Sequence, residues 1–381
     1  MIQAANRLTE VEEYYFSRKL EEIAHLKTDI PVLSLAIGSP DLQPHPSVIE
    51  SLILHAQQGN NQYQSYRGLD DLRKAMADFY WAKFDVTCDH PTEILPLMGS
   101  KEGIMHISMA FLNEGDSVLI PNPGYPTYSS VTKILRAKPI YYDLNETGNW
   151  QPDFEQLERL AQQKPKIMWI NYPHMPTGAN ASDETFERLI LFAKKHQILL
   201  VNDNPYSLIL NPNPKSIFNF EGAKYVALEL NSLSKTFNIA GWRIGMLIGN
   251  ETLLKTVLKV KTNMDSGMYY ALQKAAATAL RLDNLWYKQL NSTYEYRRKL
   301  VQEIATKLDL SFAENSCGMF VWAKIKHQEN DYEFVDRLLH DKKIFITPGS
   351  IFGSNGAGYV RLSLCVPEAQ LDEINKRINN K

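Results

Sequence analysis

The segment Ser232-Leu-Ser-Lys-Thr-Phe-Asn-Ile-Ala-Gly-Trp-Arg-Ile-Gly245 places one lysine between nearby hydroxyls and an arginine. A lysine amine can bond covalently to an aldehyde, while hydroxyls and the planar guanidinium of arginine bind phosphate. We therefore expect Lys235 to hold a cofactor that carries both groups, with Ser232, Ser234 and Arg243 at its phosphate. The alternative interpretation is a solvated surface lysine, and the other motifs of the chain have to decide between the two.

This segment resembles the lysine motif of the class I/II aminotransferases, which are enzymes of fold type I that use pyridoxal 5'-phosphate (PLP). The aspartate aminotransferase superfamily has this fold. The resemblance implies an α/β fold, in which a large domain has a mostly parallel sheet flanked by helices and a smaller domain is α+β. It also implies PLP as the cofactor. We place the large domain at residues 48–283 and the small domain at residues 1–47 and 284–381.

Composition narrows the class of protein. The chain has 381 residues, 44% of them hydrophobic and 22% charged, as expected for a soluble globular protein larger than one ordinary domain. A formal net charge of -2 argues against a nucleic-acid partner. Cys88, Cys317 and Cys365 lie far apart without ligand spacing, so we expect no metal site and a cytoplasmic location. The polar N-terminal stretch and the lack of long apolar runs predict neither a signal peptide nor a membrane span.

Short apolar runs alternate with amphipathic segments through the middle of the chain, which is typical of a parallel sheet covered by helices on both faces. We expect strands at 117–121, 166–171, 198–202 and 225–230, and helices at 101–112 and 183–196. After about residue 280 the pattern changes. We expect a long helix at 284–308, strands at 319–325 and 358–364, helices at 331–339 and 368–378, and an N-terminal helix at 11–26 that packs on this region.

Ligands of an open α/β sheet bind beyond the carboxyl ends of its strands, so the residues that follow each strand are informative. The segment Val201-Asn-Asp-Asn-Pro-Tyr206 ends a strand with an acid and has a phenol three residues later. A carboxylate keeps the pyridine nitrogen of PLP protonated, and the cationic ring then withdraws electrons from the substrate. By resemblance Asp203 contacts that nitrogen and Tyr206 the ring O3′. The alternative interpretation is an ordinary turn after a strand.

Two loops are predicted to complete the cofactor site. Gly99-Ser100-Lys101 precedes a helix, and free amides at a helix start bind phosphate. Ser100 and Lys101 are therefore candidates through their backbone amides, and the Lys101 side chain is not assigned to the phosphate. In the loop 121–128, two prolines flank Tyr125, which matches the aromatic residue that stacks on the cofactor ring in the family. A tyrosine of the core is the alternative there.

The resemblance also implies a partner subunit and a substrate site. Tyr63 matches a tyrosine that reaches the phosphate of the neighbouring subunit's cofactor, so the active form would be a homodimer. Arg361, in a predicted strand, matches the arginine that binds the substrate α-carboxylate through two parallel hydrogen bonds. Gly38 belongs to Gly38-Ser-Pro-Asp41, whose backbone would line the substrate pocket.

One position departs from the family pattern. Where members usually have Asn-Pro-Thr-Gly, this chain has Met175-Pro-Thr-Gly178. The usual asparagine donates its amide to the ring O3′, and methionine has no such donor. Either Tyr206 alone serves O3′, or His174 or a water molecule compensates.

We interpret the chain as a PLP-dependent aminotransferase that moves an amino group between an amino acid and a 2-oxo acid. By resemblance the mechanism is ping-pong, with Lys235 as general base and acid. A PLP lyase or decarboxylase is the alternative, because one fold supports several reactions. A PLP-binding regulator is a third interpretation, although the chain has no basic segment for DNA. The motifs look most like LL-diaminopimelate and aspartate-type aminotransferases, and the donor stays open.

Overall fold

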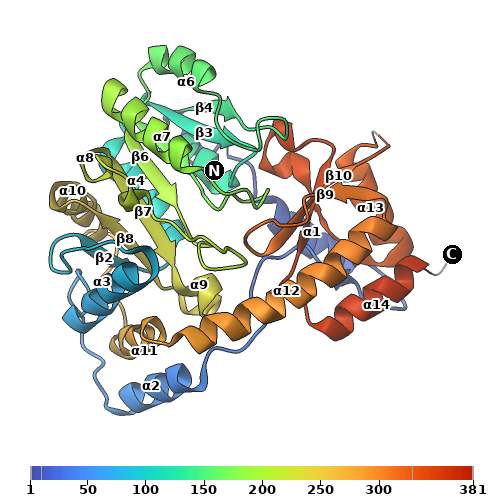
Figure 1. The fold of residues 1–381 in the computed structure, drawn as a ribbon, viewed down its shortest axis with the longest axis horizontal. Helices are drawn as coiled ribbons and strands as arrows, with labels where there is room; N and C mark the ends of the chain where they lie inside the picture. Colours follow the sequence, from blue (N-terminus) through green and yellow to red (C-terminus); the bar gives the residue numbers. More distant parts are fainter. Residues whose placement is uncertain (1, 10, 328, 380–381) are drawn as a thin grey trace.

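A seven-stranded sheet forms the centre of the computed structural model, which describes residues 2–9, 11–327 and 329–379 (Figure 1). Its strand order is β2-β8-β7-β6-β5-β3-β4, and only β8 runs antiparallel to its neighbours. The strands are β2 (Ile94–Leu97), β3 (Ser117–Asn122), β4 (Lys138–Asp143), β5 (Ile167–Ile170), β6 (Leu199–Asp203), β7 (Ala227–Ser232) and β8 (Gly245–Gly249).

Helices cover both faces of this sheet because its inner strands are apolar on both sides. Successive side chains of a strand point to opposite faces. Leu200 of β6 accordingly belongs to one buried cluster and Val201 to another. The helices are α2 (Pro46–Gln57), α3 (Asp70–Phe84), α4 (Ser100–Phe111), α5 (Pro126–Ile134), α6 (Phe154–Leu160), α7 (Asp183–His196), α8 (Ala223–Val226), α9 (Leu233–Thr236), α10 (Glu251–Lys261) and α11 (Tyr270–Leu280). The α/β class with a mostly parallel sheet is thus confirmed.

Local signals predicted strands β3, β5, β6 and β7 and helices α4 and α7 of this part of the chain. Helix α7 has the expected limits, and the Ser182 hydroxyl caps it by accepting a hydrogen bond from the Thr185 amide. The strand expected at 225–230 begins instead at Ala227, because the preceding residues form the short helix α8. Gly222, with a φ of 84°, precedes that helix, and a left-handed residue of this kind breaks an extended run.

The long helix α12 (Asn284–Lys307) leads from α11 to a second group of elements (Figure 1). This group contains a four-stranded sheet of order β12-β13-β10-β9 and the parallel pair β1-β11. The elements are α1 (Tyr15–His25), α13 (Asp331–Lys342), α14 (Glu368–Asn379), β1 (Leu33–Ser34), β9 (Leu310–Phe312), β10 (Phe320–Ile325), β11 (Ile344–Phe345), β12 (Thr347–Pro348) and β13 (Tyr359–Ser363).

The N-terminal helix is shorter than expected, since α1 begins at Tyr15 rather than near residue 11. It packs on α13, where the Lys19 ammonium lies 2.7 Å from a carboxylate oxygen of Asp336. Tyr15 also contacts the ring of Tyr332. This helix therefore joins the C-terminal elements, as the sequence predicted.

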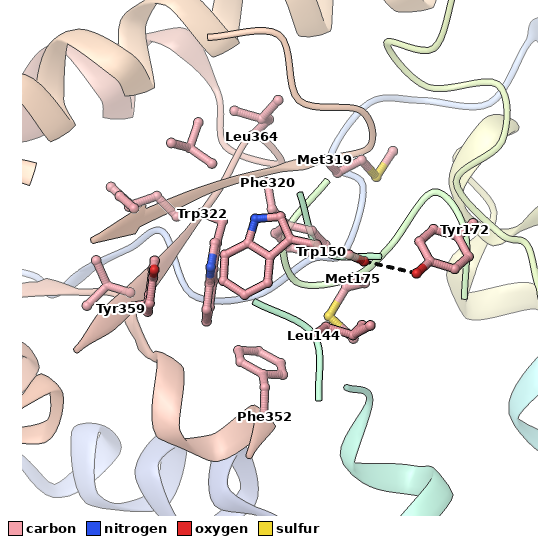
Figure 2. Packing of buried hydrophobic residues seen from close by; sticks show 14 of the residues in the cluster. Leu144, Trp150, Tyr172, Met175, Met319, Phe320, Trp322, Phe352, Tyr359 and Leu364 are labelled. Atoms are coloured by element: carbon pink, nitrogen blue, oxygen red, sulfur yellow. Dashed lines mark hydrogen bonds between the residues drawn. The ribbon is translucent and has the colours of Figure 1, made fainter. Parts of the chain in front are cut away.

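One continuous cluster of buried side chains joins the two groups of elements. Figure 2 shows Trp150 and Tyr172 of the large sheet's connections beside Trp322 of β10 and Tyr359 of β13. The Trp322 and Tyr359 rings stack at 5.0 Å, and the Tyr172 hydroxyl donates to the Trp150 carbonyl. The division of the chain at residues 48 and 284 stays a prediction. No helix among the described residues is long and apolar enough to span a membrane.

Candidate active site

A cavity of about 510 Å³ opens where β6 and β7 end and the two groups of elements meet. All of the predicted site residues except Tyr63 line it, although they come from segments far apart in the sequence. The lining residues are Tyr14, Phe16, Ile37, Gly38, Ser39, Ser100, Lys101, Tyr125, Tyr128, Asn171, Met175, Asp203, Pro205, Tyr206, Ser232, Ser234, Lys235, Ala240, Arg243, Phe320 and Arg361.

Lys235 lies on the short helix α9, directly after β7. The Ser232 hydroxyl caps this helix by accepting a hydrogen bond from the Ser234 amide. The Lys235 ammonium donates to the Gly38 carbonyl at 2.5 Å. Burial of the side chain lowers the pKa of the amine, Cys365 opposes this effect, and the cations Arg361 and Arg243 add to it. The amine is therefore closer to its reactive, neutral form than a surface lysine is.

Asp203 is the last residue of β6 and is fully enclosed. Its Oδ2 accepts a hydrogen bond from the Tyr128 hydroxyl at 2.9 Å. Its Oδ1 is buried without any hydrogen-bond partner among the described residues. Burial raises the pKa of this carboxyl to about 6, and the hydrogen bond from Tyr128 partly opposes the rise. An unpaired buried carboxylate oxygen is costly, so this atom is poised to accept a hydrogen bond from a ligand.

Hydroxyls, amides and cations gather at one end of the cavity. Ser100 begins helix α4, so its amide belongs to the unpaired donors at a helix start. Gly99 has a φ of 90°, and a Cβ there would lie 2.3 Å from the Arg243 guanidinium. At Gly245 a Cβ would lie 2.7 Å from the Ser100 nitrogen. The two glycines thus allow the helix start and the guanidinium to approach each other closely. Such a cluster of donors suits a phosphate.

Arg361 of β13 approaches from the opposite side of the cavity. Its guanidinium donates to the Ala36 carbonyl at 2.8 Å and to the Met175 sulfur at 3.3 Å. Its centre lies 3.9 Å from the centroid of the Phe320 ring. Its buried Nε has no hydrogen-bond partner among the described residues. Among the described residues, no carboxylate forms an ion pair with this buried cation, so the site favours an anionic ligand there.

The aromatic residues occupy the expected positions, and one of the alternatives for O3′ loses support. Tyr125 and Tyr206 both line the cavity, and the Lys235 ammonium lies 6.0 Å from the Tyr206 ring centroid. His174 does not line it, since its ring nitrogens contact the Thr177 hydroxyl and the Pro123 carbonyl. The chain therefore offers Tyr206, and not His174, as a donor toward the centre of the cavity.

Some lining residues escaped the sequence analysis. Tyr14 and Phe16 come from the start of α1, and the Lys101 ammonium lies 5.2 Å from the Tyr14 ring centroid. The aromatic run from Tyr14 to Phe16 within an acidic stretch was the available signal. Tyr128 lies in the same loop as Tyr125 and had no predicted role, because its contact with Asp203 has no local signal in the sequence.

Tyr63 lies outside the cavity, and 90% of its side chain is exposed. Tyr63 therefore does not contribute to the cavity of its own subunit in this structure. No group of three or more potential metal ligands occurs in the part of the chain that the structure describes.

Comparisons with known proteins agree with this geometry. Residues 30–378 match the family described as aminotransferase class I and II. The chain is 39% identical to the LL-diaminopimelate aminotransferase of Aquifex aeolicus, over 100% of this chain and 99% of the relative. It is 36% identical to the enzyme of the same name from Halothermothrix orenii, over 100% and 98%. The substrate-bound structure of BacF from Bacillus subtilis superposes with a TM-score of 0.92 at 33% identity, covering 99% of this chain and 97% of that one.

A second solved structure, an aminotransferase from Staphylococcus aureus, has a TM-score of 0.91 at 29% identity and covers 98% of both chains. The relatives span the whole chain, including both groups of elements around the cavity. The protein belongs to the class I and II aminotransferase family, and it is a PLP-dependent enzyme that transfers amino groups between amino acids and 2-oxo acids.

Proposed function

We propose that Lys235 is the catalytic residue and that the amino donor is an L-amino acid with a second charged end, as in LL-diaminopimelate. One observation carries the first part of this proposal. The Lys235 amine lines the same cavity as a cluster of phosphate-type donors, an unpaired carboxylate oxygen of Asp203 and the guanidinium of Arg361, whose Nε is unpaired among the described residues. The relatives named for LL-diaminopimelate support the second part.

The lining residues fit PLP group by group. The amides of Ser100 and Lys101, the hydroxyls of Ser232 and Ser234, and Arg243 would bind the phosphate. The buried Oδ1 of Asp203, which lacks any partner in the described residues, would accept the proton of the ring nitrogen.

One face and the O3′ edge of the cofactor ring would each be served by an aromatic residue. Tyr125 would stack on the ring, and Tyr206 would donate its hydroxyl to O3′. When bound, the cofactor supplies an aldehyde that joins amines and a ring that withdraws electrons from the donor Cα.

The residues of the chain then perform binding and proton transfer. Arg361 holds the α-carboxylate of the donor and so orients its Cα–H bond. The amine of Lys235, whose pKa burial lowers, would accept the Cα proton of the donor and deliver it to the former aldehyde carbon of the cofactor. The Gly38 carbonyl, 2.5 Å from that amine, holds it within the cavity.

Lys101 supports a donor with a second carboxylate. Its ammonium lines the cavity and contacts the Tyr14 ring, and no ion pair to it is found among the described residues. Burial and the nearby Arg243 lower its pKa, so a carboxylate there would relieve an unfavourable charge. We assign this side chain to the distal carboxylate of the donor, while its backbone amide serves the phosphate.

A homodimer and a cytoplasmic location complete the proposal. Tyr63 is exposed in its own subunit, and the family pattern assigns it to the partner's cofactor phosphate. All three cysteines are free thiols, which fits a reducing compartment.

The function is tested by adding each of a panel of amino donors, without an acceptor, and measuring the change in absorbance of the holoenzyme. We expect LL-diaminopimelate to convert the purified holoenzyme to its aminated form at concentrations where L-leucine and L-lysine do not. Lys101→Met should raise the KM for LL-diaminopimelate roughly tenfold, because a charged hydrogen bond is lost, and should leave the KM of a monocarboxylic donor unchanged. Equal KM changes for both donors would contradict the role of Lys101.

Lys235→Ala separates the catalytic assignment from the donor. This variant should retain the fold and lose turnover by at least four orders of magnitude, because both proton transfers lose their base. Borohydride reduction of the wild-type holoenzyme should attach the cofactor to the peptide that contains Lys235. Labelling of another lysine would refute the assignment, and release of ammonia with a 2-oxo acid from the donor alone would favour a lyase.

A further inference from the structure

Tyr128 makes a contact that the roles above do not use. Its side chain is fully buried near the start of α5, and its hydroxyl donates to Oδ2 of Asp203 at 2.9 Å. The other oxygen of that carboxylate has no partner among the described residues. The unpartnered oxygen therefore has its full capacity to accept a hydrogen bond from a ligand.

The position of the Tyr128 hydroxyl is strongly constrained. Its ring stacks on Trp169 of β5 at 4.9 Å with an interplanar angle of 6°, and it meets the Tyr125 ring edge-on at 5.6 Å. The backbone of Tyr128 accepts a hydrogen bond from the Thr132 hydroxyl. A side chain packed on two sides holds its rotamer, so its hydroxyl is preorganised toward Asp203.

The surroundings make this single hydrogen bond influential. The titratable groups that face Asp203 are the phenols of Tyr125, Tyr128 and Tyr206, while Lys235 lines the same cavity from α9. Among these, Tyr128 donates a hydrogen bond to the carboxylate in this structure. Burial raises the pKa of Asp203, and this donor opposes the rise by stabilising the ionised form.

We infer that Tyr128 is a positioning residue that commits one oxygen of Asp203 and thereby aims the other at the ring nitrogen of the cofactor. The inference rests on the proposed role of Asp203. Its consequence concerns the proton shared between the carboxylate and that nitrogen. Without the Tyr128 hydroxyl the carboxylate is a stronger base, and the proton shifts from the nitrogen toward Asp203. The ring then withdraws electrons less effectively from the donor.

The chain offers a matched control in Tyr142. This residue of β4 is equally buried, and its hydroxyl donates to the Trp169 carbonyl at 2.8 Å. Tyr142→Phe and Tyr128→Phe each remove one buried phenol hydroxyl next to the same tryptophan. Only the second removes a donor to Asp203, so the two variants separate lost stability from lost positioning.

The experiment is nitrogen NMR of the holoenzyme loaded with PLP that carries 15N in its ring. We expect the ring-nitrogen resonance to move toward that of an unprotonated pyridine in Tyr128→Phe and to keep its wild-type position in Tyr142→Phe. The kcat of Tyr128→Phe should fall roughly tenfold with a donor KM within twofold of the wild type, as expected for one hydrogen bond to a charged group. An unchanged resonance in Tyr128→Phe, or equal shifts in both variants, would overturn the inference.

Two further variants keep the outcome interpretable. Asp203→Asn should move the resonance by itself. If it does not, the proposed role of Asp203 is wrong, whereas a shift in Asp203→Asn without one in Tyr128→Phe refutes only the role of Tyr128. Trp169→Leu keeps the phenol but removes its stacking partner, and it should shift the resonance in the same direction by a smaller amount. If Tyr128→Phe does not fold, an unmoved resonance in Trp169→Leu contradicts the inference.

Discussion

Met175 sits where family members usually have an asparagine, and in this protein its sulfur accepts a hydrogen bond from Arg361. Its backbone amide donates to the Asn171 side chain, so the loop geometry is kept without the usual amide side chain. A thioether is a weak acceptor and no donor. Because the His174 ring contacts Thr177 and Pro123, Tyr206 and a water molecule stay as the predicted donors to O3′.

A substitution at this position should change the acidity of the lysine-bound cofactor. In Met175→Asn an amide donor would stabilise the phenolate oxygen O3′, which favours the deprotonated form of the linkage to Lys235. We expect its pKa to fall by about one unit, which corresponds to one hydrogen bond to a charged atom. Spectrophotometric pH titration of the wild-type and Met175→Asn holoenzymes measures this pKa.

Met175→Leu is the matched control for that titration, because it keeps an apolar side chain of similar volume without a donor. Its titration should coincide with the wild type. If Met175→Asn titrates at the same pH as the wild type, the missing amide has no influence on O3′.

Arg297 shows how one side chain joins whole elements. It lies on α12 with 1% of its surface exposed, and its guanidinium makes two hydrogen bonds to Asp41, at 2.6 and 2.9 Å. It also donates to Glu368 at the start of α14 at 2.8 Å. Asp41 ends the segment whose Gly38 carbonyl contacts Lys235. The long helix therefore anchors one wall of the active site.

Removal of this guanidinium should destabilise the protein measurably. We expect Arg297→Met to lower the free energy of unfolding by about 3 kcal/mol, because Asp41 and Glu368 would keep their charges without a partner. Denaturant unfolding monitored by circular dichroism measures the change. The donor KM should rise as well, since the wall at residues 38–41 loses its anchor.

Arg188→Met on α7 is the control for a helix-borne arginine, because its ion pair with Glu184 is largely exposed. Its cost should stay below about 1 kcal/mol. An equal decrease in the free energy of unfolding in the two variants would show that the ion pairs of Arg297 stabilise the protein no more than an exposed ion pair does.

The proposed homodimer places the loop around Tyr63 at a subunit interface. A Cβ at Gly267, which has a φ of 84°, would lie 2.4 Å from the Gln64 carbonyl oxygen, so the loops that carry Tyr63 and Gly267 pack tightly. Tyr63 and Tyr66 are exposed in the first of these loops, and Met264 and Tyr269 are exposed close to Gly267 in the chain.

Mixed dimers test whether Tyr63 acts across that interface. One subunit would carry Lys235→Ala and the other Tyr63→Ala, with different affinity tags for isolation. If Tyr63 serves the partner's site, the mixed dimer has one intact site and about half of the wild-type kcat. If it serves its own subunit, both sites are damaged and activity stays near that of the single variants.

Local patterns in the sequence predicted the class of fold, and the resemblance of the motifs to a known family predicted the cofactor and the type of reaction. Strands such as β3 and β6 are short, apolar and followed by polar residues, and helix α7 has a recognisable cap. Lys235 and Asp203 follow consecutive parallel strands, so their meeting at one edge of the sheet could be expected. The start of β7 could not, because a four-residue helix has too little periodicity to be recognised.

Only the tertiary structure decided which side chains contact each other across the fold. Tyr128 and Asp203 are 75 positions apart, and Arg297 and Asp41 are 256 apart. Hydrophobic periodicity predicts which face of an element is buried, but it does not predict which polar atoms of other elements contact that face. The free oxygen of Asp203, the anchored wall at Asp41 and the sulfur beside Arg361 all depend on such distant contacts.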